Sequence, residues 1–265
     1  MVEFKPATGD RRMPRTPSTK TRLALAASIG FIVLTSAYGQ GRGGPPLPPR
    51  TAKAAALYDI TGYWVSVVTE DWRFRMVTPP KGDYTGVLLN EQGRKLADAW
   101  DPAKDEAAGE QCKSYGAPSL MRVPGRLHIT WQDDQTLKVE ADAGQQMRVF
   151  HFGSADDPAV SWQGFSKAFW ETVPAGRGSA PIGSLKVVTT HLKPGYLRKN
   201  GVPYSANTTL TEYFDRVNEP NGDAYLAVTT TVEDPTYLAQ PFLTASHFRK
   251  QPDAKGWNPT PCSAR

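Results

Sequence analysis

Two stretches, "GSLKVVTTHL" at residues 183–192 and "NTTLTEYFDRV" at 207–217, decide the fold class. Each alternates between polar and apolar residues and is rich in β-branched and aromatic side chains, so each predicts a β-strand. The intervening residues 193–206 far exceed the two to five residues of an ordinary hairpin turn. Loops of this length inside a compact domain are usually functional or disordered.

The same pattern extends in both directions from this pair of strands. Six further runs after residue 125 have strand character: "RLHITWQ", "TLKVEAD", "QMRVFHF", "VSWQGFSKAFWE", "AYLAVTTTV" and "FLTASHFRK". Turn-forming segments such as "DAGQ" and "NEPNGD" separate them. The opening run "DITGYWVSVVTEDWRFRMV" at 59–77 adds one or two more. Because no helices alternate with these strands, a parallel α/β sheet is excluded, and we expect an all-β domain of 8–10 strands, an antiparallel barrel or sandwich.

A short helical insertion is predicted near residues 90–112. Asn90 is a favourable N-cap for "EQGRKLADAW", and Asp101 followed by Pro102 provides a second helix start. Two short helices that meet at Asp101 are the expectation.

The N-terminal segment has the features of a secretory signal peptide. Basic residues precede the apolar run "LALAASIGFIVL" at 23–34, and Ala37 and Gly39 are the small residues of a cleavage site near Gly39–Gln40. We expect a signal peptide at 1–39, a Gly/Pro-rich linker at 40–57 and a β-barrel domain at 58–265, with Met13 as an alternative start. The exported protein would be periplasmic or secreted, with no permanent membrane span.

The charge of the chain belongs largely to this leader. Residues 1–39 hold six of the 31 Lys and Arg and two of the 26 Asp and Glu, so the remainder carries 25 positive and 24 negative residues. A net charge near +1 gives no basic surface of the kind that nucleic acid requires. A small-molecule ligand is the favoured partner.

Both cysteines, Cys112 and Cys262, lie in the exported part. An oxidising compartment favours a disulfide between them, and two unpaired buried thiols are the alternative. Neither cysteine has a neighbour that indicates catalysis.

Two resemblances accompany these patterns. "DITGYW" at 59–64 resembles the Gly-x-Trp opening of lipocalin-type barrels, in which the tryptophan, here Trp64, closes one end. This resemblance favours the barrel, and we expect a lipocalin-like antiparallel barrel of 8–10 strands. Six elements also resemble, in order and spacing, a group of uncharacterised secreted bacterial all-β proteins. They are "CKSYGAPSLMRVP" (112–124), "DAGQQMR" (142–148), "QGFSKAFWE" (163–171), "GSLKVVTT" (183–190), "LTEYF" (210–214) and "VEDPTYLAQPF" (232–242). This second resemblance implies an exported, all-β, barrel-shaped protein and no particular reaction.

The long loop carries residues suited to ligand contact. Asn200–Gly201 predicts a tight turn at its tip, and prolines on both sides stiffen it. The alternative is that its tyrosines pack against the barrel while its cations face water. The ligand-binding candidates, including aromatic residues that could line a barrel interior, are Trp64, Arg148, Trp170, Tyr196, Arg198, Tyr204 and Tyr213.

Catalytic signals are weak. The four histidines lack the spacing of a metal site, so no metal or cofactor is expected. "GFSKA" at 164–168 is not a nucleophile elbow. If the protein is an enzyme, two carboxylates in one cleft are the best acid–base pair, and the candidate residues are Glu171, Glu212, His151 and Arg148.

Three functions therefore stay open at this stage. The first is an exported barrel that binds a small, partly apolar ligand in its interior, with the 193–207 loop over the entrance. The second is an enzyme that acts on a sugar or lipid-like substrate through carboxylate and histidine chemistry. The third is a non-enzymatic envelope interaction module.

Overall fold

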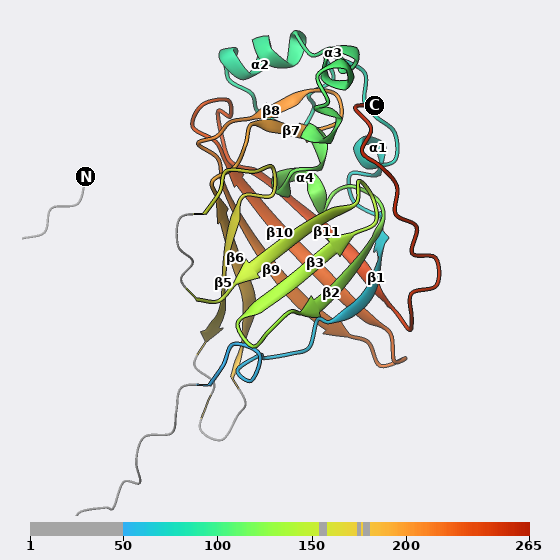
Figure 1. The fold of residues 1–265 in the computed structure, drawn as a ribbon, viewed down its shortest axis with the longest axis vertical. Helices are drawn as coiled ribbons and strands as arrows, with labels where there is room; N and C mark the ends of the chain where they lie inside the picture. The colour runs from blue at the N-terminus through green and yellow to red at the C-terminus, as the bar shows by residue number, and fades with distance from the viewer. Residues whose placement is uncertain (1–49, 154–157, 174–175, 177–180) are drawn as a thin grey trace, which may run out of the picture. The chain divides into compact units, whose positions relative to one another are not determined.

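The computed structural model describes residues 50–265, apart from 154–157, 174–175 and 177–180. The predicted signal peptide and most of the predicted linker lie outside these residues. The described chain forms a closed β-barrel, as the strand pattern predicts (Figure 1). Its strands are β1 (Gly62–Val67), β2 (Arg126–Trp131), β3 (Thr136–Ala141), β4 (Gln146–His151), β5 (Phe165–Val173), β6 (Ile182–Thr190), β9 (Thr209–Asn218), β10 (Ala224–Glu233) and β11 (Phe242–Gln251).

The strands follow the order β1-β11-β10-β9-β6-β5-β4-β3-β2, and β2 closes the barrel on β1. Every pairing is antiparallel except that of β4 with β5, which is parallel over Phe150–Ser166 and His151–Lys167. Two parallel strands begin at the same end of the sheet, so the chain must cross back from the end of β4 before β5 begins. A tight turn cannot make this connection. The expectation of an antiparallel barrel therefore holds for all neighbours but this one.

Alternation along the strands divides interior from exterior. In β10 the residues at every second position, from Ala224 to Val232, are buried, as a barrel wall requires. The interior is filled by apolar side chains from all nine strands together with residues from the two ends. They include Ile60, Trp64, Leu120, Met121, Leu127, Ile129, Leu137, Val139, Phe150, Leu185, Val187, Phe214, Leu226, Val228 and Phe248.

One end of the barrel is covered by the chain between β1 and β2 and by a two-stranded hairpin (Figure 1). The covering helices are α1 (Trp72–Arg75), α2 (Glu91–Asp98), α3 (Pro102–Ala107), the 3₁₀ helix η1 (Gln111–Tyr115) and α4 (Ala117–Leu120), and the hairpin strands are β7 (Gly195–Arg198) and β8 (Val202–Tyr204). A second apolar cluster unites helices, hairpin and the nearby strand ends. No helix among the described residues is long and apolar enough to cross a membrane.

The two predicted helix starts are confirmed. The Asn90 side chain accepts a hydrogen bond from the Gly93 N–H at the start of α2, and Asp101 accepts one from Ala103 at the start of α3. Each satisfies a backbone donor that the first helical turn leaves free.

The structure refines three local expectations. The opening run forms one strand, β1, the lower of the two numbers expected, because residues 72–75 form α1. The strand predicted from Val160 begins only at Phe165. The predicted linker also overlaps the fold, since Ala52 is buried and its N–H donates to Gln135 while its carbonyl accepts from Trp170. In each case tertiary contacts outweigh the local pattern.

The long 191–208 segment is an ordered, buried hairpin. β7 and β8 are almost wholly buried. The Asn200 side chain donates to the carbonyls of Pro80 and Asp83, which ties the tip of the hairpin to the helical cover. Gly201 has a φ of 81°, and a Cβ there would meet the Trp100 ring at 2.2 Å, so both conformation and space require glycine.

Candidate functional site

Two of the predicted ligand-binding residues belong to the packing of the barrel. Trp64 is fully buried, and its indole donates to the Ile60 carbonyl at 2.9 Å. Trp170 packs edge-on against Tyr58 at a centroid distance of 5.1 Å. Both rings fill space that an interior ligand would need.

Arg148 and Glu212 form a fully buried ion pair inside the barrel. The guanidinium donates through Nη1 to one carboxylate oxygen at 3.1 Å and through Nη2 to the other at 2.5 Å. Nη2 also lies 3.2 Å from Thr189 Oγ1 and 3.5 Å from Ser166 Oγ. The pair is thus bidentate, and two hydroxyl groups lie beside the guanidinium, while Arg148 Nε has no hydrogen-bond partner among the described residues. Bidentate contact of this kind makes a buried ion pair tolerable.

The other candidate catalytic residues do not join this pair. Glu171 lies on the outer face of β5, where it pairs with Lys186 at 3.1 Å. His151 stacks on Phe165 on the outer face at 5.0 Å between ring centroids. Tyr213 is also on the outside, beside Lys186. The structure therefore brings Arg148 and Glu212 together and leaves Glu171, His151 and Tyr213 apart from them.

The tyrosines of the hairpin pack inward. The Tyr196 hydroxyl donates to Asp105 at 2.9 Å, and burial together with this carboxylate raises the pKa of Tyr196 to about 12. Tyr204 is fully buried, and burial raises the pKa of its hydroxyl. Of the hairpin candidates, Arg198 lines the cavity described next.

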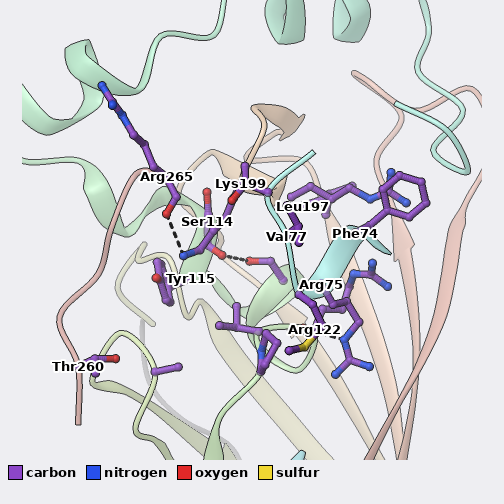
Figure 2. Close-up of a pocket in the computed structure, with 17 residues that line it drawn as sticks. Phe74, Arg75, Val77, Ser114, Tyr115, Arg122, Leu197, Lys199, Thr260 and Arg265 are labelled. Carbon is purple, nitrogen blue, oxygen red and sulfur yellow. Dashed lines mark hydrogen bonds between the residues drawn. The ribbon is translucent and has the colours of Figure 1, made fainter. Parts of the chain in front are cut away.

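That cavity has a volume of about 450 Å³ and lies at the covered end, outside the packed interior of the barrel. Its walls are the α1 segment, the η1–α4 segment, the tip of the β7–β8 hairpin, the β3–β4 turn and the C-terminal tail. The lining side chains that carry the argument below are Phe74, Arg75, Met76, Val77, Arg122, Leu197, Arg198, Lys199 and Arg265. We call this space the rim cavity. Figure 2 shows Phe74, Arg75 and Arg122 grouped on one side of it.

Three buried arginines meet at the rim cavity. Arg75 Nε donates to the Arg122 carbonyl at 2.9 Å, and its Nη1 pairs with Glu70. Arg122 Nη1 donates to Asp71 at 2.9 Å. Arg198 Nη1 donates to a backbone carbonyl, that of Thr85, at 2.7 Å. Within the described residues, Arg198 has no carboxylate partner at salt-bridge distance.

Each of these three guanidinium groups retains a buried nitrogen without a hydrogen-bond partner among the described residues: Arg75 Nη2, Arg122 Nη2 and Arg198 Nε. Burial lowers the pKa of all three, and Arg122 lowers the pKa of its two neighbours further through like-charge repulsion. The pKa of Arg198 falls to about 10. A charge that is 96% buried yet this poorly compensated is costly for the fold.

Aromatic and apolar side chains complete the walls. The Arg198 guanidinium lies 4.3 Å from the centroid of the Phe74 ring and 5.7 Å from that of Phe242. Such contacts attract a cation without neutralising it. Met76 and Val77 lie beside Phe74, and both are exposed. The rim cavity thus has a cationic part and an apolar part.

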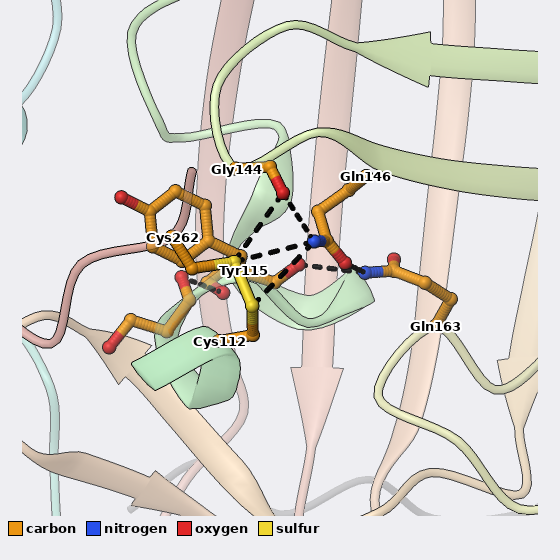
Figure 3. The surroundings of a disulfide bond; sticks show 8 residues. Cys112, Tyr115, Gly144, Gln146, Gln163 and Cys262 are labelled. Atoms are coloured by element: carbon orange, nitrogen blue, oxygen red, sulfur yellow. Dashed lines mark hydrogen bonds between the residues drawn. A yellow bond between two sulfur atoms is a disulfide. The ribbon is translucent and has the colours of Figure 1, made fainter. Parts of the chain in front are cut away.

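The disulfide confirmed between Cys112 and Cys262 fixes one wall (Figure 3). It ties the C-terminal tail to η1, and the Thr260 N–H donates to the Asp142 carbonyl. Gln146 Nε2 donates to the Gly144 carbonyl at 2.6 Å beside the sulfurs. Gly144 has a φ of 76°, and a Cβ there would meet the Tyr115 ring at 2.4 Å. This junction holds Tyr115 and Thr260 at the cavity.

The sequence interpretation missed Arg75, Arg122 and Phe74. A signal was present, because Arg75 lies between Phe74 and Met76 and Arg122 lies between Met121 and Val123. This signal is informative for Arg122, because the neighbouring Met121 is buried, but not for Arg75, because the neighbouring Met76 is 60% exposed. Arg198, next to Leu197, was identified through the loop instead.

Among the described residues there is no group of three or more His, Cys, Asp or Glu side chains placed to hold a metal ion. A comparison with known protein families and with curated proteins finds no match for the chain. Function must therefore be inferred from the site itself.

Proposed function

We propose that the protein binds a small, partly apolar organic anion, and that the rim cavity holds it. The observation that supports this most directly is the set of three buried arginine side chains, each with a free N–H, around one cavity. None of the residues that line the rim cavity in the described chain is acidic. The proposal retains the class of ligand that the sequence suggested and moves its place from the barrel interior to the rim.

The energetics favour an anionic ligand. A buried donor without a partner destabilises a fold by about 1–3 kcal/mol, and more when it is charged. A carboxylate or phosphate that accepts from Arg75, Arg122 and Arg198 would supply the missing partners. Guanidinium groups suit such ligands because their planar N–H pairs match the oxygens bidentately.

The filled interior is the reason for placing the ligand at the rim. The barrel centre is filled by the buried side chains of Trp64, Phe150 and Phe214. The Arg148–Glu212 pair fills the next layer toward the covered end. A ligand there would have to displace these side chains. The rim cavity needs no such rearrangement.

Calorimetric titration with hexanoate, hexyl phosphate and hexanol tests the proposal. The three probes share a chain length and differ in charge, so the two anions should bind and the alcohol should not at the same concentration. The variant Arg198→Met should weaken anion binding by about tenfold or more, because it removes a charge-assisted contact.

The matched control is Arg249→Gln. Arg249 is an exposed arginine that pairs with Asp223 on the outside of the barrel, remote from the cavity lining. Binding of hexanol as tight as that of the anions would overturn the proposal. So would equal effects of Arg198→Met and Arg249→Gln.

We also propose that the protein acts outside the cytoplasm, in the periplasm or after secretion. The disulfide supports this, since such bonds persist in oxidising compartments. N-terminal sequencing of the protein recovered from the cell envelope should give a start near Gln40. A start at Met1 or Met13 would contradict removal of a signal peptide.

A further inference from the structure

The mouth of the rim cavity carries an exposed apolar strip. Met76 is 60% exposed and Val77 is 65% exposed, and both line the cavity. Trp72, 62% exposed, lies on the same short segment. Large apolar side chains exposed next to one another commonly mark a binding surface.

This strip continues into the cavity instead of ending at its mouth. Phe74 lines the cavity from the α1 side and Leu197, fully buried, lines it from the hairpin side. The Arg198 guanidinium lies over the Phe74 ring, so the apolar wall leads directly to the buried cations. A ligand that enters from solvent therefore contacts the apolar surface first and the buried guanidinium groups further inside the cavity.

We infer that the ligand is a single-chain amphiphile, with a carboxylate or phosphate head among Arg75, Arg122 and Arg198 and an alkyl chain along Phe74, Met76 and Val77. This inference rests on the proposed function and specifies the class of its ligand. The head group is placed at the arginines because its charge is opposite to theirs. The alkyl chain is placed along the exposed apolar strip because both are apolar. The strip is then covered when the ligand is bound.

The two parts of the site make separate contributions to affinity. The head group supplies contacts to the guanidinium groups that do not depend on chain length. Each methylene that becomes fully buried should tighten binding by about fourfold, which corresponds to the usual free energy of burying one CH₂ group. A head-only site shows no such dependence.

The test is a titration series of alkyl carboxylates and alkyl phosphates of two to twelve carbons, each kept below its micelle concentration. Dissociation constants should fall steadily with chain length until the chain passes beyond the strip, and then level off. Running both series distinguishes the two heads. The tighter series at equal chain length identifies the head that the arginines prefer.

Matched variants locate the chain. Val77→Thr and Met76→Gln change apolar surface at the mouth and should flatten the dependence on chain length while leaving the shortest anions unaffected. Val217→Thr and Met147→Gln make the same changes at exposed positions outside the cavity lining, 46% and 54% exposed, and should alter nothing.

Each outcome has a distinct meaning. Equal binding of short and long anions overturns this inference and leaves the proposed function intact. Absence of binding for every anion overturns both. A chain-length dependence that Met147→Gln flattens as much as Met76→Gln would place the chain elsewhere and contradict the inference.

Discussion

The barrel interior and the rim cavity both bury arginine, and they treat it differently. Inside the barrel, Arg148 donates to both carboxylate oxygens of Glu212 and lies within hydrogen-bond distance of two hydroxyl groups. At the rim, Arg198 donates to one backbone carbonyl and lies near the faces of two aromatic rings. Arg148 also keeps a buried Nε without a partner among the described residues. The two regions therefore differ in the carboxylate that compensates the buried charge, and the lack of one beside Arg198 is the basis for the proposed ligand.

The layer around Arg148 also explains how the two regions are separated. Glu212 pairs in register with Thr230 on β10, and Thr230 pairs with Thr244 on β11. Thr244 in turn accepts a hydrogen bond from Arg122 of the rim cavity at 2.5 Å. This row of polar residues lies between the apolar barrel core and the apolar cluster of the covered end. The rim cavity is therefore built on the polar layer and does not open into the core.

The largest expected effect comes from breaking the interior pair. Glu212→Gln removes the charge that compensates Arg148 and should lower the free energy of unfolding by about 3–5 kcal/mol, the usual result of leaving one buried partner uncompensated. Urea denaturation measures it. The matched change Glu171→Gln removes an exposed carboxylate paired with Lys186 and should alter stability by about 1 kcal/mol or less. Equal losses of stability in the two variants would show that the buried Arg148–Glu212 pair matters no more to the fold than an exposed pair.

The disulfide is expected to come next. Replacing Cys112 and Cys262 by alanine should lower the free energy of unfolding by about 2–5 kcal/mol, because the bond closes a loop of 150 residues. It should also weaken anion binding, since Thr260 and Arg265 of the tail would no longer be held at the rim cavity. Reduction of the wild-type protein should reproduce both changes. A loss of stability with unaltered anion affinity would show that the tail is not part of the site.

The smallest expected effect concerns acid sensitivity at Asp59. Burial alone would raise the pKa of Asp59, but hydrogen bonds from Thr61 and the nearby charge of Lys250 outweigh it and hold that pKa below its ordinary value. A lowered folded-state pKa stabilises the fold above the unfolded pKa of about 4, and this contribution is lost as the pH falls further. Asp59→Asn should therefore lower stability slightly at pH 7 and reduce its decline below pH 4. If Asp59→Asn leaves the decline in stability below pH 4 unchanged, the lowered pKa of Asp59 is contradicted.

The sequence predicts the barrel well because its strands alternate. β10 shows this most clearly, since every second residue is buried, and β9 shows the same alternation from Leu210 to Phe214. The turn between them, at residues 219–223, contains Pro, Asn and Gly. The capped helices α2 and α3 are equally local signals. The parallel pairing of β4 with β5 could not be predicted, because it depends on which strand lies beside β4 in the closed barrel and not on a local pattern.

The site was harder to predict than the fold. Arg198 was identified through its long loop, but the prediction could not show that Arg75 and Arg122, from segments far apart in sequence, approach the same cavity. Glu171 and Glu212 looked alike as strand carboxylates. Their faces differ, because Glu212 follows the inward alternation of β9 and Glu171 follows the outward alternation of β5. The candidate site is defined by residues that lie close together in space, and the order of residues along the chain does not show which of them do.

The most direct test of this account compares the stability of Arg198→Met with that of the wild-type protein in the absence of any added anion. If Arg198 is held for a ligand, replacing its poorly compensated charge by an apolar side chain of similar length should leave the free energy of unfolding unchanged or raise it, while anion binding falls. A loss of several kcal/mol, comparable to that of Glu212→Gln, would show that Arg198 is an architectural residue like Arg148 and would contradict the account.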